Sequence, residues 1–543
     1  MSSSGAKPVI KATDHPNSTA GELPGLLNIT LEEVAEGLQS SKFTSVDIVK
    51  AYLARIEESN DEFRSVIETN PDAVRAAELL DEERHRSGRR GYWHGVPILV
   101  KDNIVTQDRM ETTSGSCALV GAKPDNEASV VSKFRKAGAV ILGKTNLSEW
   151  ANFRSSMTSN GWSPRGGQTM GTYYPKSEPS GSSAGSGVAT SLGLCIASLG
   201  SETAGSIICP AEINCVVGLK PTRGLVANDG CVPISHRQDV VGPMTRTVRD
   251  AAHMLNTLAG RSEADDFTWN IPFDPIPDFT TSCQTIDIKG IKIGVPRNTF
   301  IEVASPILAA FEIALTTLAT AGAEIIENTD FESVEEFLKQ DKVTQSFCIA
   351  AEFKSDLATY FAALKNNPHN IHNMKDLITY TQNTPEEQYP DRDTERFLWT
   401  QKEGADVSSA KYKELMEKDQ YFGGVGGILG ALKKHNLDIL AVPSTLDIPT
   451  LFAAKMGFPI LSVPLGFYPE DTKIEMNKRG NLVAIAPGIP FCITFITKAF
   501  DDAKLLRVGY AFEQITKVRL NGPKPFKVPK TELKDVLQRA QKL

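Results

Sequence analysis

The sequence predicts an α/β protein in which helices cover both faces of a β-sheet. Short apolar runs typical of buried strands, such as "GVPILVKDN" and "AVILGKT", alternate with amphipathic helical patterns such as "TSVDIVKAYLARIEE". The 543-residue chain is 41% hydrophobic and 23% charged, which is ordinary globular usage and allows a large buried core. These apolar runs occur on both sides of the Gly/Ser-rich stretch "GSSAGSG" at 181–187, so we expect one core rather than two linked domains.

The individual elements follow from their patterns in chain order. Residues 1–26 are expected to be a disordered N-terminal tail, and the folded domain is expected to cover 27–543. Thr30 and Glu33 have the spacing of a capping box, which predicts that a helix begins with "LEEVAEGL". The residues from about 331 to 425 are more polar and predict a variable, mainly helical insertion.

The remaining strands and helices are predicted from apolar runs and helical periodicity. The predicted strands after the first two are "LCIASLGS", "IKIGVP", "AEIIE", "LDILAVPS", "FPILSVPLGF" and "PFCITFITKAF". The predicted helices are "SVVSKFRKAG", "GVATSLG", "RTVRDAAHMLNTLAG", "PILAAFEIALTTLATAG" and "DDAKLLRVGYAFEQIT".

Charge and cysteine usage exclude several classes of protein. The net charge of −8 is spread without long blocks of one sign, which argues against nucleic acid as a partner. The N-terminal segment lacks a signal-like apolar run, and no stretch approaches 18 apolar residues, so no membrane span is expected. The eight cysteines have no CxxC or CxxH spacing and the eight histidines no HExxH pairing, so we expect a cytoplasmic protein with no metal and no cofactor.

Residues 138–145, "GAVILGKT", match the phosphate-loop pattern G-x-x-x-x-G-K-[ST]. A phosphate loop needs a flexible turn between a strand and a helix, whereas the intervening Ala, Val, Ile and Leu favour the interior of a strand. We therefore expect a buried strand here, with Lys144 just past it, and no nucleotide site.

Three segments together suggest catalysis. Lys101 ends the apolar run "PILVK", Ser182 lies in "PSGSSAGSG", and Ser206 lies 24 positions later in "GSETAGSIICPAEINCVVGLKPT". Alone, Lys101 could be a plain lysine at a strand end and Ser182 a helix cap. Together the small residues and the spacing indicate a cradle in which backbone approaches a reacting atom.

This combination resembles the amidase signature family of serine hydrolases, strongly over about 28–260 and again near the C-terminus. The segments "EWANFRSS" and "SPRGGQ" look most like peptide amidases and their fungal relatives. The resemblance implies a single large α/β/α layered domain with a central mixed β-sheet and a signature core at about 95–260. It also implies a carboxamide-hydrolysing enzyme that acts through an acyl-serine intermediate.

By this resemblance Ser206 is the nucleophile, Ser182 a bridging serine that follows a cis peptide bond after Gly181, and Lys101 the base. A lysine can serve as a base when burial keeps it neutral, although the neighbouring Asp102 would act in the opposite direction if its carboxylate faced the ammonium. The backbone N–H groups of Thr203, Ala204, Gly205 and Ser206 would form the oxyanion hole. The family's usual "TDTGGS" or "TETDGS" loop is "SETAGS" here, which leaves these three roles unchanged.

Substrate specificity should lie in "EWANFRSSMTSNGW", with Asn152, Ser155, Ser156 and Trp162 as candidate substrate-binding residues, and in the insertion. The expected partners are a small-molecule or peptide amide and, for assembly, a second copy of the chain in a homodimer. Two alternatives stay open: the glutaminase subunit of a tRNA-dependent amidotransferase, and a non-catalytic scaffold that keeps the fold.

Overall fold

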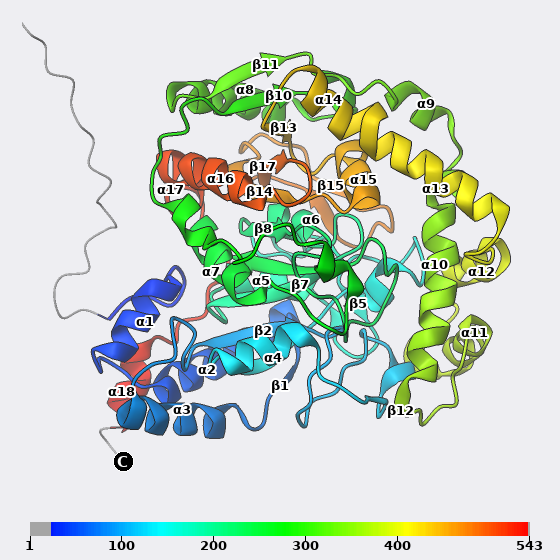
Figure 1. The fold of residues 1–543 in the computed structure, drawn as a ribbon. Helices are drawn as coiled ribbons and strands as arrows, with labels where there is room; N and C mark the ends of the chain where they lie inside the picture. The colour runs from blue at the N-terminus through cyan, green and yellow to red at the C-terminus, as the bar shows by residue number, and fades with distance from the viewer. Residues whose placement is uncertain (1–22, 541–543) are drawn as a thin grey trace, which may run out of the picture.

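The computed structural model describes residues 23–540, and within them a mixed eleven-stranded sheet runs through the whole molecule (Figure 1). The strand order is β1-β4-β2-β7-β9-β8-β14-β17-β13-β10-β11. Strand β2 is parallel to β4 and β7, and β10 is parallel to β11 and β13, while the central strands pair antiparallel. The predicted α/β class with a mixed central sheet is confirmed.

The strands of this sheet are β1 Val66–Thr69, β2 Pro97–Lys101, β4 Val140–Thr145, β7 Ala197–Glu202, β8 Val217–Lys220, β9 Val240–Thr245, β10 Lys292–Val295, β11 Glu324–Glu327, β13 Ile439–Pro443, β14 Ile460–Phe467 and β17 Pro490–Ile496. Short two-stranded pairs are β3 Lys123–Pro124 with β12 Leu364–Asn366, β5 Trp162–Ser163 with β6 Gly167–Gln168, and β15 Glu475–Met476 with β16 Val483–Ile485.

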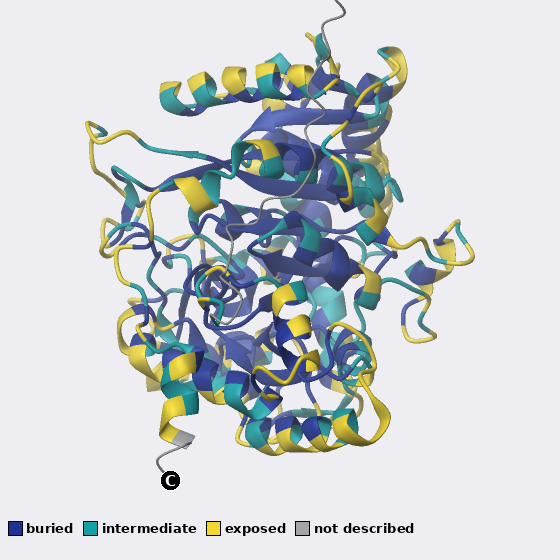
Figure 2. Ribbon diagram, turned by 90° about the vertical axis from the view of Figure 1, so that its left-hand side faces the viewer, coloured by how far each residue is buried: buried dark blue, intermediate teal, exposed yellow. Residues whose placement is uncertain are grey.

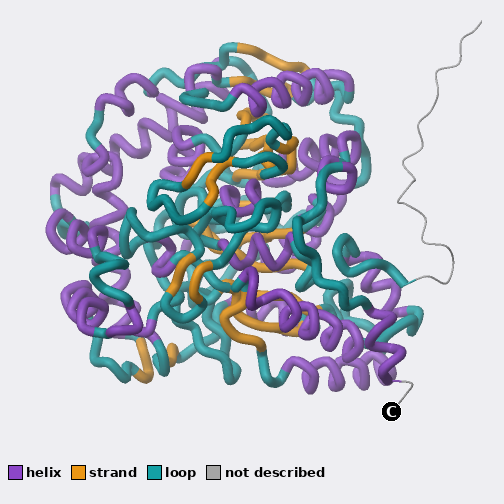
Figure 3. Tube along the Cα trace, turned by 180° about the vertical axis from the view of Figure 1, so that it is seen from behind, coloured by secondary structure: helices purple, strands orange, loops and turns teal. Residues whose placement is uncertain are grey.

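Helices surround the sheet, as the views from opposite sides show (Figures 1 and 3). They are α1 Leu31–Gln39, α2 Ser45–Phe63, α3 Ala73–Ser87, α4 Ser129–Lys136, α5 Ala184–Ser191, α6 Ile208–Ile213, α7 Val248–Leu258, α8 Ser305–Thr320, α9 Val334–Lys339, α10 Lys342–Ala362, α11 Met374–Asn383, α12 Glu395–Glu403, α13 Ala410–Gly423, α14 Leu429–Lys434, α15 Asp447–Met456, α16 Asp502–Thr516, α17 Val518–Asn521 and α18 Leu533–Ala540.

Local sequence explains where the first helices begin. Thr30 accepts the backbone N–H of Glu33, whose carboxylate accepts the N–H of Thr30, so α1 begins with the predicted capping box. Thr44 and Asp47 form a second capping box at the start of α2. Of the expected tail, residues 1–22 lie outside the described residues. Leu26 belongs to the folded domain, because it is fully buried and its N–H donates to Glu532 at 2.8 Å.

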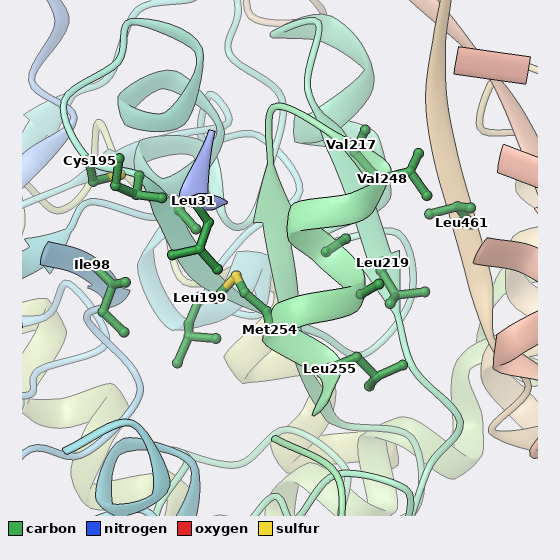
Figure 4. Close-up of a cluster of buried hydrophobic side chains, with 14 of the residues drawn as sticks. Leu31, Ile98, Cys195, Leu199, Val217, Leu219, Val248, Met254, Leu255 and Leu461 are labelled. Carbon is green, nitrogen blue, oxygen red and sulfur yellow. The ribbon is translucent and has the colours of Figure 1, made fainter. Parts of the chain in front are cut away.

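The core lies between the sheet and its helices, where the strands are buried and the outer helical faces exposed (Figure 2). Figure 4 shows part of it: Leu199 and Leu219 from the sheet lie beside Met254 and Leu255 of α7. The fully buried strands stabilise the fold by roughly 25 cal/mol for each Å² of apolar surface removed from water. This packing fixes the strand ends from which the site is built.

Residues 331–425, the segment for which we expect an insertion, contain helices α9 to α13, at the right-hand side of Figure 1. A separate apolar cluster joins this insertion to the rest of the molecule through Trp150, Phe353 and Phe397. Trp150 is fully buried between the rings of Phe361 and Phe397. The insertion therefore packs directly against the segment that begins at Glu149. Among residues 23–540, no helix has both the length and the apolar character needed to cross a membrane.

Candidate active site

Lys101 ends strand β2 with a fully buried side chain. Its ammonium nitrogen lies 2.8 Å from Ser182 Oγ, 3.0 Å from the carbonyl oxygen of Ser201 and 2.9 Å from Ser201 Oγ. β2 is parallel to β7, so the end of β7 brings Ser201 beside Lys101. The structure thus joins two of the three predicted residues directly.

Burial lowers the pKa of Lys101 to about 7. Asp239 and Glu202 act in the opposite direction, because negative charge near the amine favours its ammonium form. The Cys231 thiol would do the same only when ionised, and burial raises its pKa to about 12. Asp102 does not approach the amine: its Oδ2 accepts hydrogen bonds from the N–H of Gly115 at 3.0 Å and from the Thr113 hydroxyl. The sequence left open whether burial or the Asp102 carboxylate controls the pKa of Lys101, and the structure shows that burial does. With a pKa of about 7, a large fraction of the Lys101 amine is neutral near pH 7.

Ser182 is held by its backbone as well as by Lys101. The Gly181–Ser182 peptide bond is cis, as the resemblance implied, and the carbonyl oxygen of Ser182 accepts the N–H of Ser148 at 3.0 Å. A Cβ atom on Gly181 would lie 2.3 Å from Ser148 Oγ, and one on Gly185 would lie 2.3 Å from the carbonyl oxygen of Ser65. The glycines at 181 and 185 therefore allow the chain to pack closely against Ser148 and Ser65; the approach of this backbone to a reacting atom stays a prediction.

Ser206 lies in the turn after β7, is 7% exposed, and lines a cavity of about 520 Å³. Within residues 23–540, no hydrogen bond joins the hydroxyls of Ser182 and Ser206, although the N–H of Ser183 donates to the carbonyl oxygen of Ser206 at 3.1 Å. In the same range the N–H groups of Ala204, Gly205 and Ser206 donate to no other group of the chain. These N–H groups remain available to a ligand, and Thr203 and Ala204 also line the cavity.

Two acidic side chains fix this turn. The Thr203 hydroxyl donates to Asp239 Oδ1 at 2.6 Å, while Asp239 Oδ2 accepts the N–H groups of Ile234 and Ser235. Glu202 Oε2 accepts the N–H of Ile207 at 2.7 Å. Burial raises the pKa of Asp239 to about 6. The turn that carries Ser206 is therefore held at both ends.

Sequence reasoning missed three residues around Lys101. Ser201 contacts the amine twice, Asn103 donates to Ser201 Oγ at 2.9 Å and to Cys231 Sγ at 3.3 Å, and Asp239 contributes charge. Asn103 is two residues from Lys101, and Ser201 is five residues from Ser206. Their closeness to the predicted catalytic residues is the sequence feature that could have identified them. Asp239 is distant in sequence, and only the fold brings it close.

The candidate substrate-binding residues divide into two groups. Asn152, Ser155 and Ser156 line the cavity beside Ser206. Trp162 does not: its indole is 3% exposed and lies under the guanidinium groups of Arg154 and Arg392, with Cζ 5.4 and 4.6 Å from the ring centroid. Trp162 is therefore buried against two guanidinium groups and does not line the cavity.

A buried ionic cluster anchors the cavity wall to the insertion. Arg154 donates to Glu149 Oε2 at 2.6 Å and to Glu387 Oε2 at 2.7 Å, and all three side chains are almost fully buried. Burial and the nearby Glu387 raise the pKa of Glu149 well above its usual value. The backbone of Trp150, Ala151 and Asn152 is left-handed, with φ of 48°, 50° and 72°. Non-glycine residues rarely adopt this conformation, so the surrounding packing must hold it.

The phosphate-loop match is a strand, as predicted. Lys144 lies inside β4 rather than just past it, and its fully buried amine donates to the carbonyl oxygen of Ile104 and, at 2.8 Å, to Thr112 Oγ1. An amine held in this way cannot reach a phosphate. Among the residues described, no group of three or more His, Cys, Asp or Glu side chains is arranged to hold a metal ion.

Comparison with known proteins agrees with this geometry. The sequence matches the Amidase family over residues 47–506. It is 43% identical over 541 residues to an Arthroderma benhamiae protein named "Putative amidase", covering 95% of this chain and 90% of that one. It is 31% identical over 516 residues to a glutamyl-tRNA(Gln) amidotransferase subunit from Chloroflexus aurantiacus, covering 92% of this chain and 99% of that one.

Among solved structures, the fold is similar to native peptide amidase from Stenotrophomonas maltophilia. The TM-score is 0.81 at 35% sequence identity, and the match covers 91% of this chain and 98% of that one. Sequence and fold thus agree over nearly the whole chain. The chain is a member of the Amidase family and a hydrolase that acts on amide bonds.

Proposed function

We propose that this hydrolase is a serine amidase that cleaves a small or peptide carboxamide through an acyl-Ser206 intermediate, with Ser182 and Lys101 moving the proton. The observation that carries the proposal is the 2.8 Å contact between Lys101 Nζ and Ser182 Oγ, whose side chains are both fully buried. A serine hydroxyl is a weak nucleophile and needs a nearby base. A buried amine with a pKa near 7 can act as that base at neutral pH.

In the proposed reaction Ser206 Oγ attacks the amide carbon while its proton passes to Ser182 Oγ, and the Ser182 proton passes to the Lys101 amine. The N–H groups of the 203–206 turn stabilise the negative charge on the carbonyl oxygen. The same path in reverse protonates the leaving amine, and water then hydrolyses the acyl-serine.

The substrate class is argued from the cavity and from similarity. A cavity of about 520 Å³ holds an amide larger than acetamide, and the solved neighbour is a peptide amidase. We therefore propose peptide amides and comparable small carboxamides as substrates. The eight cysteines are free thiols in the described structure, which fits a reducing compartment such as the cytoplasm.

The test is ammonia release by the purified chain from a panel of peptide amides and small carboxamides. Wild type should release ammonia unaided, Ser206→Ala should not, and Lys101→Ala should release it far more slowly than wild type. The glutaminase alternative, which the Chloroflexus relative keeps open, predicts release from glutamine only when a partner chain is added. A non-catalytic scaffold predicts no release from any amide.

A further inference from the structure

The cavity beside Ser206 carries an excess of positive charge. Of the described side chains that line it, Arg396, Lys478 and Arg479 are cationic, and Glu178 is the one carboxylate. Lys478 and Arg479 follow strand β15, whereas Arg396 comes from the first turn of α12 in the insertion. Segments far apart in sequence thus bring cations to the same cavity as the proposed nucleophile.

Two of these charged groups already have partners. Arg479 donates to Asp391 Oδ2 at 2.6 Å and to the Asp391 carbonyl oxygen at 3.1 Å. Glu178 Oε1 accepts the side-chain amide of Asn160 at 3.1 Å. Arg479 therefore already has a carboxylate partner, Asp391, which does not line the cavity.

Arg396 is different. Its Nη1 donates to the carbonyl oxygen of Asn152 at 2.9 Å, and its Cζ lies 5.7 Å from the ring centroid of Phe153. Within residues 23–540 Arg396 forms no ion pair. The carboxylate of the adjacent Glu395 instead accepts hydrogen bonds from the N–H and the hydroxyl of Ser156. Arg396 is thus a positioned cation in the cavity wall that has no hydrogen-bonded counter-ion among the described residues, although the nearby Glu395 carboxylate favours its charged form.

A guanidinium in this state favours an anionic ligand. It carries five N–H donors in a planar fork that matches a carboxylate, and one of them is used by Asn152. Burial lowers the pKa of Arg396 because it destabilises the charged form. Arginine nevertheless remains protonated at neutral pH, so the charge is available and only partly hydrated. A carboxylate from a ligand would supply the hydrogen-bonded counter-ion that Glu395 does not provide.

We propose that Arg396 binds an anionic group of the substrate, so that the enzyme prefers amides whose acyl portion carries a carboxylate. This inference rests on the proposed amidase function and adds a substrate class to it. The competing role for Arg396 is purely structural, because its bond to Asn152 supports the left-handed turn over 150–152. A structural role would affect all substrates alike, whereas a binding role depends on substrate charge.

The experiment measures kcat/KM for N-acetyl dipeptide amides that differ by Glu, Gln or Lys at one position. Each set is made twice, with the variable residue either carrying the scissile amide or preceding it. In at least one position, wild type should prefer Glu over Gln by about tenfold, as expected for one charge-assisted hydrogen bond, and Lys should be the poorest. Raising the ionic strength should reduce the preference.

Three variants separate charge from structure. Arg396→Gln keeps a donor for the Asn152 carbonyl and should lose the preference for Glu, while Arg396→Lys should keep part of it. Arg479→Gln is the matched control and should keep the preference, because Asp391 already pairs with that guanidinium.

The proposal is overturned if wild type does not distinguish Glu from Gln at either position, or if Arg396→Gln lowers kcat/KM equally for all substrates. The wild-type comparison decides the matter even if a variant does not fold. If no peptide amide is hydrolysed at all, the proposed function itself fails. If neutral peptide amides are hydrolysed without a charge preference, only the role of Arg396 is wrong.

Discussion

Lys101 Nζ lies 2.8 Å from Ser182 Oγ, and neither side chain is accessible to solvent. The two residues are 81 positions apart, and the contact depends on β2 and on the backbone that precedes α5. Because burial sets the protonation state of Lys101, this contact connects the fold directly to a measurable pH dependence.

The first prediction is an acid limb in the kcat/KM profile near pH 7. The pKa of Lys101 is depressed to about 7, so the amine is protonated and inactive below this pH and becomes neutral as pH rises through it. Activity should therefore rise from acid to neutral pH and then level off. Lys101→Ala should lower amide turnover by about 10²–10⁴-fold, the usual contribution of a general base.

Lys101→Arg is the control for charge. It retains a cation but cannot give up its proton, so it should be no better than Lys101→Ala. A Lys101→Ala enzyme with near-normal turnover and the same acid limb would mean that the base lies elsewhere.

The second prediction concerns Asp239, which contributes negative charge near Lys101 and accepts the Thr203 hydroxyl. Asp239→Asn removes the charge that favours the ammonium form, so the acid limb should move to lower pH. It should also lower kcat, because an asparagine cannot accept all three hydrogen bonds that the carboxylate accepts. The measurement is the pH dependence of kcat/KM. The control is Asp229→Asn, which should leave the acid limb in place because Asp229 accepts a hydrogen bond from Ser129. If the acid limb does not move in Asp239→Asn, the charge of Asp239 does not influence the pKa of Lys101.

The third prediction concerns Lys144. Lys144→Met should leave turnover per folded molecule largely intact and should lower the free energy of unfolding by on the order of 2 kcal/mol, because the carbonyl of Ile104 and the hydroxyl of Thr112 lose a buried donor. Urea unfolding and ATP titration test both points. Saturable ATP binding that disappears in the variant would restore the phosphate-loop interpretation.

The fourth prediction concerns the attachment of the insertion. Arg154→Leu leaves Glu149 and Glu387 buried without their shared cation, which should cost about 3–5 kcal/mol of unfolding free energy. Arg75→Leu is the matched control, since its pair with Glu78 is exposed and should contribute at most about 1 kcal/mol. Equal stability of the two variants would show that the buried cluster does not hold the insertion.

The sequence predicted well what depends on local pattern. Fully buried strands such as β2 and β4 appear as apolar runs, and α1 begins at its capping box. The candidate residues Lys101, Ser182 and Ser206 were found from motif spacing and resemblance, and the fold brings them to one region.

What the sequence could not predict depends on tertiary orientation. Nothing in "KDN" shows that Asp102 faces backbone N–H groups instead of its neighbour's amine. Trp162 lies in the segment expected to bind substrate, but its ring packs against Arg154 and Arg392. These two arginines are more than 200 positions apart in sequence, so the contact depends on the tertiary fold. Arg396 belongs to no motif, whereas Asp239 lies in "DGCVPISHRQDVVGPM", a segment that resembles peptide amidases but does not itself show that this carboxylate faces Lys101. Both residues reach the site because the insertion and the 235–239 loop fold back onto it.

The central claim is that Ser206 is the nucleophile, and covalent labelling tests it most directly. Wild-type protein treated with a serine-directed fluorophosphonate should gain the mass of one adduct, and peptide mapping should place it on Ser206 rather than on the other serines that line the cavity. Ser206→Ala should remain unlabelled, and Lys101→Ala should label far more slowly. An adduct on another residue, or unchanged labelling of Ser206→Ala, would contradict the account.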